Sequence, residues 1–347
     1  LAIWAVKRGG GRPYPVLVLL LTVTAVSAAC LTNVTTVVLF APVTLLVCDR
    51  LGTRPAPVLV ASALAANIGG SATLVGDPSN IIIASRSGVT FNDFLVNTAP
   101  ISVVVLAAYL VAIRFLLRPT LVGARGAAHE LDSLDERAAI TDPSLLRSGV
   151  VVLSLVVLGF MLQGVTGVEP AVVAVAGAAV LTLLSRQSPQ TYLEAVEWET
   201  LAFFAGIFIV IGALVKTGVI DRLAGRVAGT TGANVSLTLA VVLVASAVIS
   251  GLVDNIPYVV AMSPLVADLV AENPALATHG GVWWALSLGA VLGGNATAVG
   301  ASANIVIVGL ARRYGAPITF KGFATYGLPV AVGAIALCLP YVLLRYA

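Results

Sequence analysis

Long apolar runs separated by short polar segments form the pattern of this chain. Because a membrane-spanning helix needs about 20 apolar residues, the pattern predicts a set of membrane helices. Two pairs of runs are joined by only a few polar residues, and the second run of each pair is short for a crossing. The runs lie near 15–31, 35–48, 56–84, 98–117, 149–165, 171–185, 200–215, 235–253, 258–271, 282–309 and 323–345.

The two close pairs predict re-entrant helical hairpins over 15–48 and 235–271, each with a polar tip inside the membrane. The tips read Thr32-Asn33-Val34-Thr35-Thr36 and Asp254-Asn255-Ile256-Pro257, and Asn33 aligns with Asn255 at an offset of 222 residues.

A second duplicated feature is a glycine-broken polar stretch. The segment from Gly69 to Asn80 recurs from Gly293 to Asn304, 224 positions later. An uninterrupted membrane helix avoids such residues because they expose the backbone or carry polar groups into hydrocarbon. The pattern predicts broken helices over 56–84 and 282–309, and a duplicated break is typical of secondary transporters. The glycines expected to break the backbone are Gly69, Gly70, Gly76, Gly293, Gly294 and Gly300.

Together these features predict two repeats. Residues 1–117 form the first repeat, whose N-terminal part we expect upstream of Leu1, and 118–148 form a polar connector loop. Residues 149–347 form the second repeat, with scaffold helices over 149–215. Basic residues flank the first hairpin on both sides, which places its ends in the cytoplasm. Counting crossings from there opens the second hairpin to the outside, so the repeats are inverted, although Lys216, Arg222 and Arg226 fall outside in this count.

The composition supports an all-α integral membrane protein, multi-pass in the cell membrane. Hydrophobic residues make up 59% of the chain and charged residues 10%, whereas a soluble domain carries about 25% charged residues. The net charge of +3 reflects membrane orientation rather than nucleic-acid binding. We find no phosphate-binding loop, zinc spacing or nucleophile–base set, so we expect no enzyme activity, no cofactor, and no metal other than Na⁺ as a coupling ion in place of H⁺.

The two hairpin tips and the two glycine-broken stretches predict a site near the bilayer midplane. Helix ends and free backbone groups there can hold an ion or a small polar solute. Amides and hydroxyls there can bind Na⁺ or an oxyanion without adding charge. Alternatively, they only satisfy backbone groups freed by the glycine breaks. The candidate ligands are Asn33, Thr35, Thr36, Thr73, Asn80, Asn255, Asn295, Thr297, Ser302 and Asn304.

Asp77 and Asp254 are the candidate coupling residues, for H⁺ or Na⁺. A carboxylate deep in an apolar segment is costly, and it tends to be a cation ligand or a reversible proton carrier. Alternatively, each Asp caps the N-terminus of a half-helix, since prolines follow closely. The duplication is not symmetric here, because Ala301 matches Asp77 and Thr32 matches Asp254.

The tips and breaks quoted above resemble the arsenite permease, P-protein and NhaD-like branch of the ion transporter superfamily, which is distantly related to the divalent anion/sodium symporters. The resemblance covers nearly the whole chain. It implies a homodimer with an elevator mechanism, in which a scaffold dimerises while the hairpins and broken helices move. It also implies a cytoplasmic ATPase subunit as a partner. Relatives in this branch usually carry an acid before the first hairpin asparagine, where this chain has Thr32.

We therefore expect a secondary active transporter, with arsenite or antimonite efflux by proton exchange as the favoured function. A neutral trihydroxy solute suits a site of amides and hydroxyls. A Na⁺/H⁺ antiporter, a Na⁺-coupled symporter of dicarboxylate-like anions, and a channel-like or purely structural membrane protein are the alternatives.

Overall fold

The computed structural model describes residues 13–118, 120, 142–185, 188–196, 198–218, 234–273, 275–276 and 280–347, and no strand occurs among them. Five helices of this described part are long and apolar enough to cross a membrane. The chain is thus a helical, multi-pass membrane protein. The five are α2 (Pro13–Cys30), α3 (Asn33–Leu51), α7 (Ala99–Leu116), α10 (Pro143–Met161) and α20 (Phe320–Tyr346).

The first hairpin consists of α2 and α3. Thr32 caps α3 by accepting a hydrogen bond from the backbone N–H of Thr35, and Gly52, with φ 62°, ends it. The expected short second arm is wrong, since α3 has 19 residues. The cap draws the polar tip into the first helical turn, and the helix continues to Leu51. Arm length therefore gives no argument for a re-entrant first hairpin.

The first broken helix consists of α4 (Pro55–Gly70) and α5 (Pro78–Ser87). Asp77 caps α5, and Pro78 occupies its first turn, where a missing N–H costs nothing. Every residue of α4 from Val58 to Gly70 is buried, so this half-helix lies in the core. The short α6 (Phe91–Asn97) and then α7 follow.

The same order of elements returns in the C-terminal half. A helical pair is followed by a buried half-helix, a polar break, a second half-helix and a long closing helix. Its members are α16 (Val235–Ser250), α17 (Asn255–Glu272), α18 (Gly281–Gly293), the 3₁₀ turn η2 (Gly294–Ala296), α19 (Ser302–Arg313) and α20.

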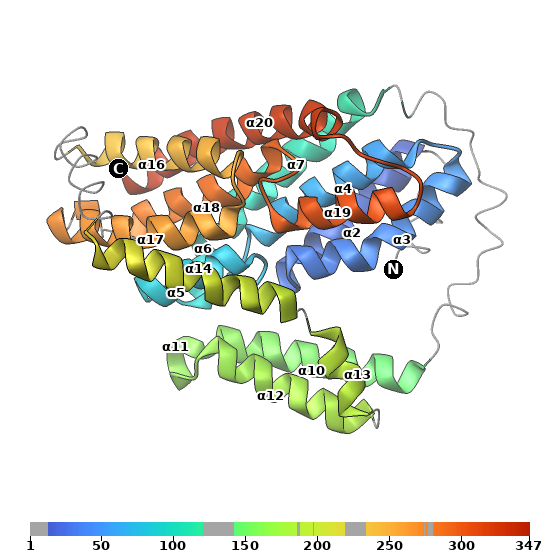
Figure 1. The fold of residues 1–347 in the computed structure, drawn as a ribbon, viewed down its shortest axis with the longest axis horizontal. Helices are drawn as coiled ribbons and strands as arrows, with labels where there is room; N and C mark the ends of the chain where they lie inside the picture. The colour runs from blue at the N-terminus through green and yellow to red at the C-terminus, as the bar shows by residue number, and fades with distance from the viewer. Residues whose placement is uncertain are drawn as a thin grey trace.

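The two helical pairs lie at opposite ends of the long axis of the molecule, with their connecting tips turned toward its centre (Figure 1). Of the helices between the repeats, those over 143–185 and 189–195 form a separate layer, seen below the rest in Figure 1, whereas the helix over 198–216 lies beside α17. Most of the expected connector over 118–148 lies outside the described residues. Its last part differs from a loop, since α10 begins at Pro143. This layer comprises α10, α11 (Gln163–Thr166), α12 (Pro170–Ser185) and α13 (Pro189–Ala195), followed by α14 (Trp198–Lys216), which contacts α17.

Candidate functional site

The two ends of each break lie in close backbone contact at a pair of glycines. A Cβ atom placed on Gly70 would lie 2.6 Å from the carbonyl oxygen of Gly76, and one on Gly76 would lie 2.6 Å from the oxygen of Gly70. Gly294 and Gly300 approach each other in the same way, at 2.5 Å. Only glycine allows the two ends of each break to come this close.

The threonines of the breaks tie each break to the hairpin of its own repeat. The Thr73 hydroxyl donates to the backbone oxygen of Ala29 at 2.6 Å, and the Thr297 hydroxyl donates to that of Gly251 at 2.7 Å. The backbone also joins tip and break. The Asn33 N–H donates to the Gly76 oxygen at 3.0 Å, and the Asn255 N–H donates to the Gly300 oxygen at 3.1 Å.

Asn80 and Asn304 satisfy the backbone of the breaks themselves. The Asn80 side-chain amide donates to the oxygens of Gly70 and Thr73 at 3.3 and 2.9 Å. Asn304 makes the two equivalent bonds in the second break, at 2.9 and 2.8 Å. This arrangement is the one expected if the asparagines serve freed backbone groups.

Asp77 lies where the two hairpin tips meet, and it is fully buried. Its Oδ1 caps α5 by accepting from the Ser79 N–H and hydroxyl, at 2.9 and 2.6 Å. Asn33 of the first tip donates to its Oδ2 at 2.8 Å, and Asn255 of the second tip donates to both oxygens, at 3.0 and 3.2 Å. One carboxylate thus joins a broken helix to both hairpins.

Asp254 is only partly buried and caps α17, accepting from the Ile256 N–H at 2.9 Å. Its second oxygen accepts from the Ser302 hydroxyl at 2.7 Å, in the first turn of α19. Both acids are therefore N-caps, as the alternative expected. Each also links a hairpin to a broken helix, a role that capping does not require.

Three remaining candidates differ in their surroundings. Thr35 is exposed and accepts from the Thr32 hydroxyl at 2.8 Å. Thr36 Oγ1 and Asn295 Nδ2 are buried, and neither has a hydrogen-bond partner among the described residues.

Asn67, on the buried half-helix α4, was missed by the sequence analysis. Its Oδ1 accepts from Asn33 at 3.0 Å, and its Nδ2 donates to Asn295 and Asn304, both at 2.9 Å. It therefore connects the Asp77 cluster to the second break. The available signal was an asparagine in an otherwise apolar run, two residues before Gly69.

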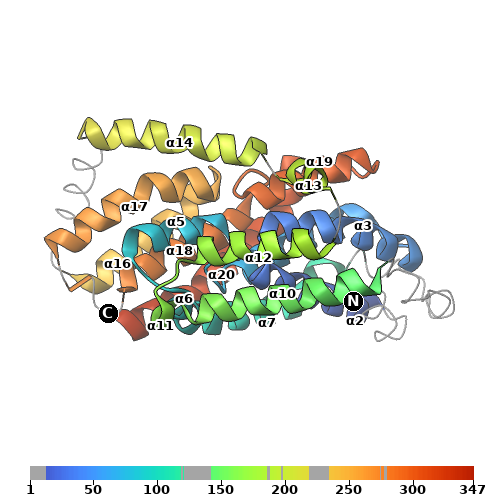
Figure 2. The same cartoon turned by 90° about the horizontal axis from the view of Figure 1, so that it is seen from below.

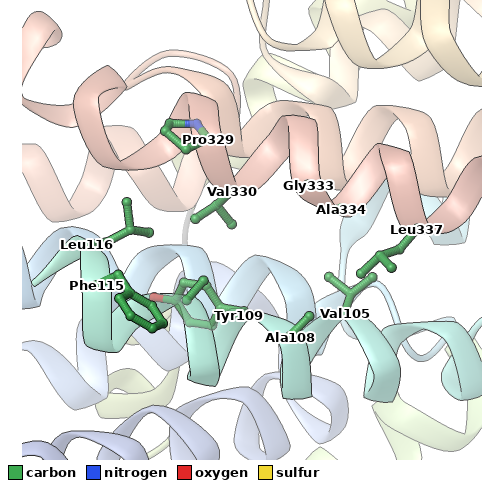
Figure 3. Close-up of a pocket in the computed structure, with 11 residues that line it drawn as sticks. Val105, Ala108, Tyr109, Phe115, Leu116, Pro329, Val330, Gly333, Ala334 and Leu337 are labelled. Carbon is green, nitrogen blue, oxygen red and sulfur yellow. The ribbon is translucent and has the colours of Figure 1, made fainter.

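Two apolar cavities lie against α20, apart from the carboxylates. One, of about 290 Å³, lies between α7 and α20 and is lined by residues that include Val105, Tyr109 and Leu337 (Figure 3). The other, of about 340 Å³, lies between α16, α18 and α20 and reaches Ala296 and Thr297. Neither lining includes a carboxylate or an asparagine.

Comparison with known proteins gives a family and several relatives. Residues 1–289 match the model described as CitMHS, citrate transporter. An uncharacterized transporter of Mycobacterium tuberculosis is 50% identical over 99% of this chain and 80% of its own length. The 46 kDa membrane protein of Mycobacterium leprae is 47% identical over the same shares. The P protein of Sus scrofa is 30% identical over 99% of this chain and 50% of its own length. The expected similarity to the P protein is thus confirmed.

Proposed function

The chain belongs to the citrate transporter family of secondary transporters, and we propose that it couples solute movement to a cation gradient through Asp77 and Asp254. The observation that carries this proposal is the contact of Asp77 with both hairpin tips.

Loading of Asp77 with a cation changes how the tips are held. Backbone N–H groups, amides and hydroxyls donate the hydrogen bonds that the two carboxylates accept. A proton on Asp77 occupies an acceptor position, so it competes with the Asn33 and Asn255 donors. Na⁺ does the same by taking a carboxylate oxygen as a ligand. No described residue donates to Asn255 Oδ1, which can serve as a further oxygen ligand for Na⁺.

Two solutes fit this site in different ways. Arsenite or antimonite leaving in exchange for protons suits a site whose polar side chains, apart from the two carboxylates, are neutral amides and hydroxyls. Citrate, which the family description names, would need its charge offset by cotransported cations. The Na⁺/H⁺ antiporter and the Na⁺-coupled anion symporter use the same carboxylates with other cargo.

Flux into proteoliposomes tests the coupling and separates these forms. Proton-driven arsenite movement, Na⁺-stimulated citrate uptake and Na⁺-dependent proton release without either solute each identify one form. Asp77→Asn keeps the size of the side chain but removes its charge, so we expect it to abolish ion-driven accumulation. Asp254→Asn is expected to do the same.

The matched control is Asp93→Asn, which changes an exposed N-terminal carboxylate of α6. It should transport at the wild-type rate, because an asparagine oxygen can still accept the hydrogen bond that the Thr90 N–H donates to Asp93. Coupled transport that survives in both Asp77→Asn and Asp254→Asn would overturn the assignment.

The proposal extends to the architecture implied by the two repeats: opposed re-entrant hairpins, an elevator movement and a homodimer. The helices α10–α14 would be the fixed scaffold. The exposure of α12 supports this role. This helix buries none of its residues and exposes Val172, Val175 and Leu183, as a helix that faces lipid or a second copy would. The mass of the detergent-solubilised protein tests the dimer. A cytoplasmic ATPase subunit belongs only to the arsenite form, and co-purification tests it.

A further inference from the structure

Asn295, in the second break, has a pair of hydrogen-bond donors for which the described residues provide no acceptor. Its side chain is fully buried, and its Oδ1 accepts from Asn67 at 2.9 Å. Its Nδ2 has no acceptor among the described residues. An unsatisfied buried amide is unfavourable and rare in native structures, so this group calls for an explanation.

The orientation of this amide is fixed by backbone groups at both ends of the network. At one end, Asn304 Nδ2 donates to two backbone carbonyls of the second break, so its Oδ1 must face Asn67. At the other end, the Val34 N–H donates to Asn33 Oδ1, so Asn33 Nδ2 must face Asn67 Oδ1. Asn67 therefore presents its amino group to Asn295. The oxygen of Asn295 is used, and its amino group has no acceptor in the part of the chain that the structure describes.

The first repeat gives the equivalent position a partner. Ser71 corresponds to Asn295, and its hydroxyl bonds Ser102 of α7 at 2.8 Å. When the closing helices are aligned by Pro100 and Pro329, Ala331 of α20 takes the place of Ser102. Ala331 lines the same cavity as Ala296, which follows Asn295 in the sequence. The second repeat thus offers a methyl group where the first offers a hydroxyl.

We propose that Asn295 Nδ2 donates to an oxygen atom of the transported solute. The ligand class is an oxygen acceptor, such as a carboxylate or a hydroxyl, because a bare cation would need the carbonyl oxygen that Asn67 already occupies. Asn33, Asn80 and Asn304 have both their amide hydrogens and their oxygens engaged within the protein. The inference rests on the proposed function and assigns Asn295 to the solute rather than to the coupling ion.

The test uses the full-length chain in proteoliposomes, with citrate and arsenite as probes. Asn295→Asp keeps an oxygen for Asn67 and replaces the amino group with a second acceptor. We expect the half-saturating concentration of the transported probe to rise about tenfold or more, since a hydrogen bond to a charged oxygen contributes on that order. The half-saturating concentration of the driving cation should stay unchanged.

Two further variants separate solute binding from a structural effect. Ala331→Ser supplies an internal acceptor for the amino group, so it should raise the half-saturating probe concentration while raising the melting temperature. Ser71→Ala removes the matched contact of the first repeat, and it should lower the melting temperature without changing the half-saturating probe concentration.

The outcomes distinguish this inference from the proposed function. A wild-type protein that transports a probe, together with an Asn295→Asp variant of unchanged half-saturation, overturns the inference alone. Equal changes in solute and cation half-saturation also overturn it. A wild-type protein that moves neither probe overturns the proposed function and this inference with it.

Discussion

Thr73 and Thr297 make the same bond in the two repeats, and this bond ties each break to the backbone of its hairpin. Each hydroxyl donates to a backbone oxygen where the first hairpin arm ends, at 2.6 and 2.7 Å. We expect Thr73→Val, which keeps the shape and removes the donor, to cost about 1 kcal/mol of stability. Melting of the purified protein measures this loss, and Thr73→Ser should restore most of it. A valine variant that melts like wild type but loses solute affinity would show that the hydroxyl is a ligand instead.

Side-chain chemistry was visible in the sequence, but its partners were not. Asp77 and Asn33 stood out because polar groups are costly in apolar segments. The bond from Asn255 to Asp77 joins residues 178 positions apart, and no local pattern encodes such a distance. Asn67 was missed because a single asparagine between Ala66 and Ile68, ahead of the glycines of the break, does not by itself predict a hydrogen-bond partner.

The two glycine pairs decide whether the broken helices can form. A Cβ atom on Gly300 would lie 2.5 Å from the Gly294 oxygen, which belongs to the backbone of the closed break and cannot move aside as a flexible side chain could. We therefore expect Gly300→Ala to abolish transport and reduce the yield of folded protein. Gly309→Ala is the matched control in α19, because nothing lies within 4 Å of its added Cβ. Size-exclusion profiles and transport assays of both variants check this, and wild-type behaviour of Gly300→Ala would contradict it.

The apolar pattern predicted the boundaries of helices with long apolar runs. It did not predict the boundaries of helices whose ends are polar and set by a cap. The run at 235–253 corresponds to α16, which ends at Ser250. The ends of α4 and α18 were visible in the sequence as the adjacent glycines Gly69-Gly70 and Gly293-Gly294. The length of α3 was underestimated at both ends, because Thr32 caps a first turn rich in polar residues and because the polar residues Asp49 and Arg50 continue the helix to Leu51. Apolar content alone cannot measure a helix whose first turn is polar.

At the scale of the whole molecule, the two hairpins meet at a single carboxylate from opposite directions. Their bases then lie far apart, near Arg54 after α3 and Glu272 at the end of α17, and both residues are exposed. If the repeats are inverted, these bases face opposite sides of the membrane. We expect a membrane-impermeant maleimide to label Arg54→Cys only in inside-out vesicles and Glu272→Cys only in intact cells.

The labelling needs a background in which Cys30, Cys48 and Cys338 are replaced by alanine, since Cys30 is exposed. Labelling of both positions from the same side would contradict the inverted arrangement, and the tips could then meet at Asp77 only if one hairpin crossed the whole membrane. Labelling from opposite sides means that the two hairpins extend toward Asp77 from opposite faces of the membrane. A single carboxylate at that meeting point can then release its ion to either side in turn, as coupled transport requires.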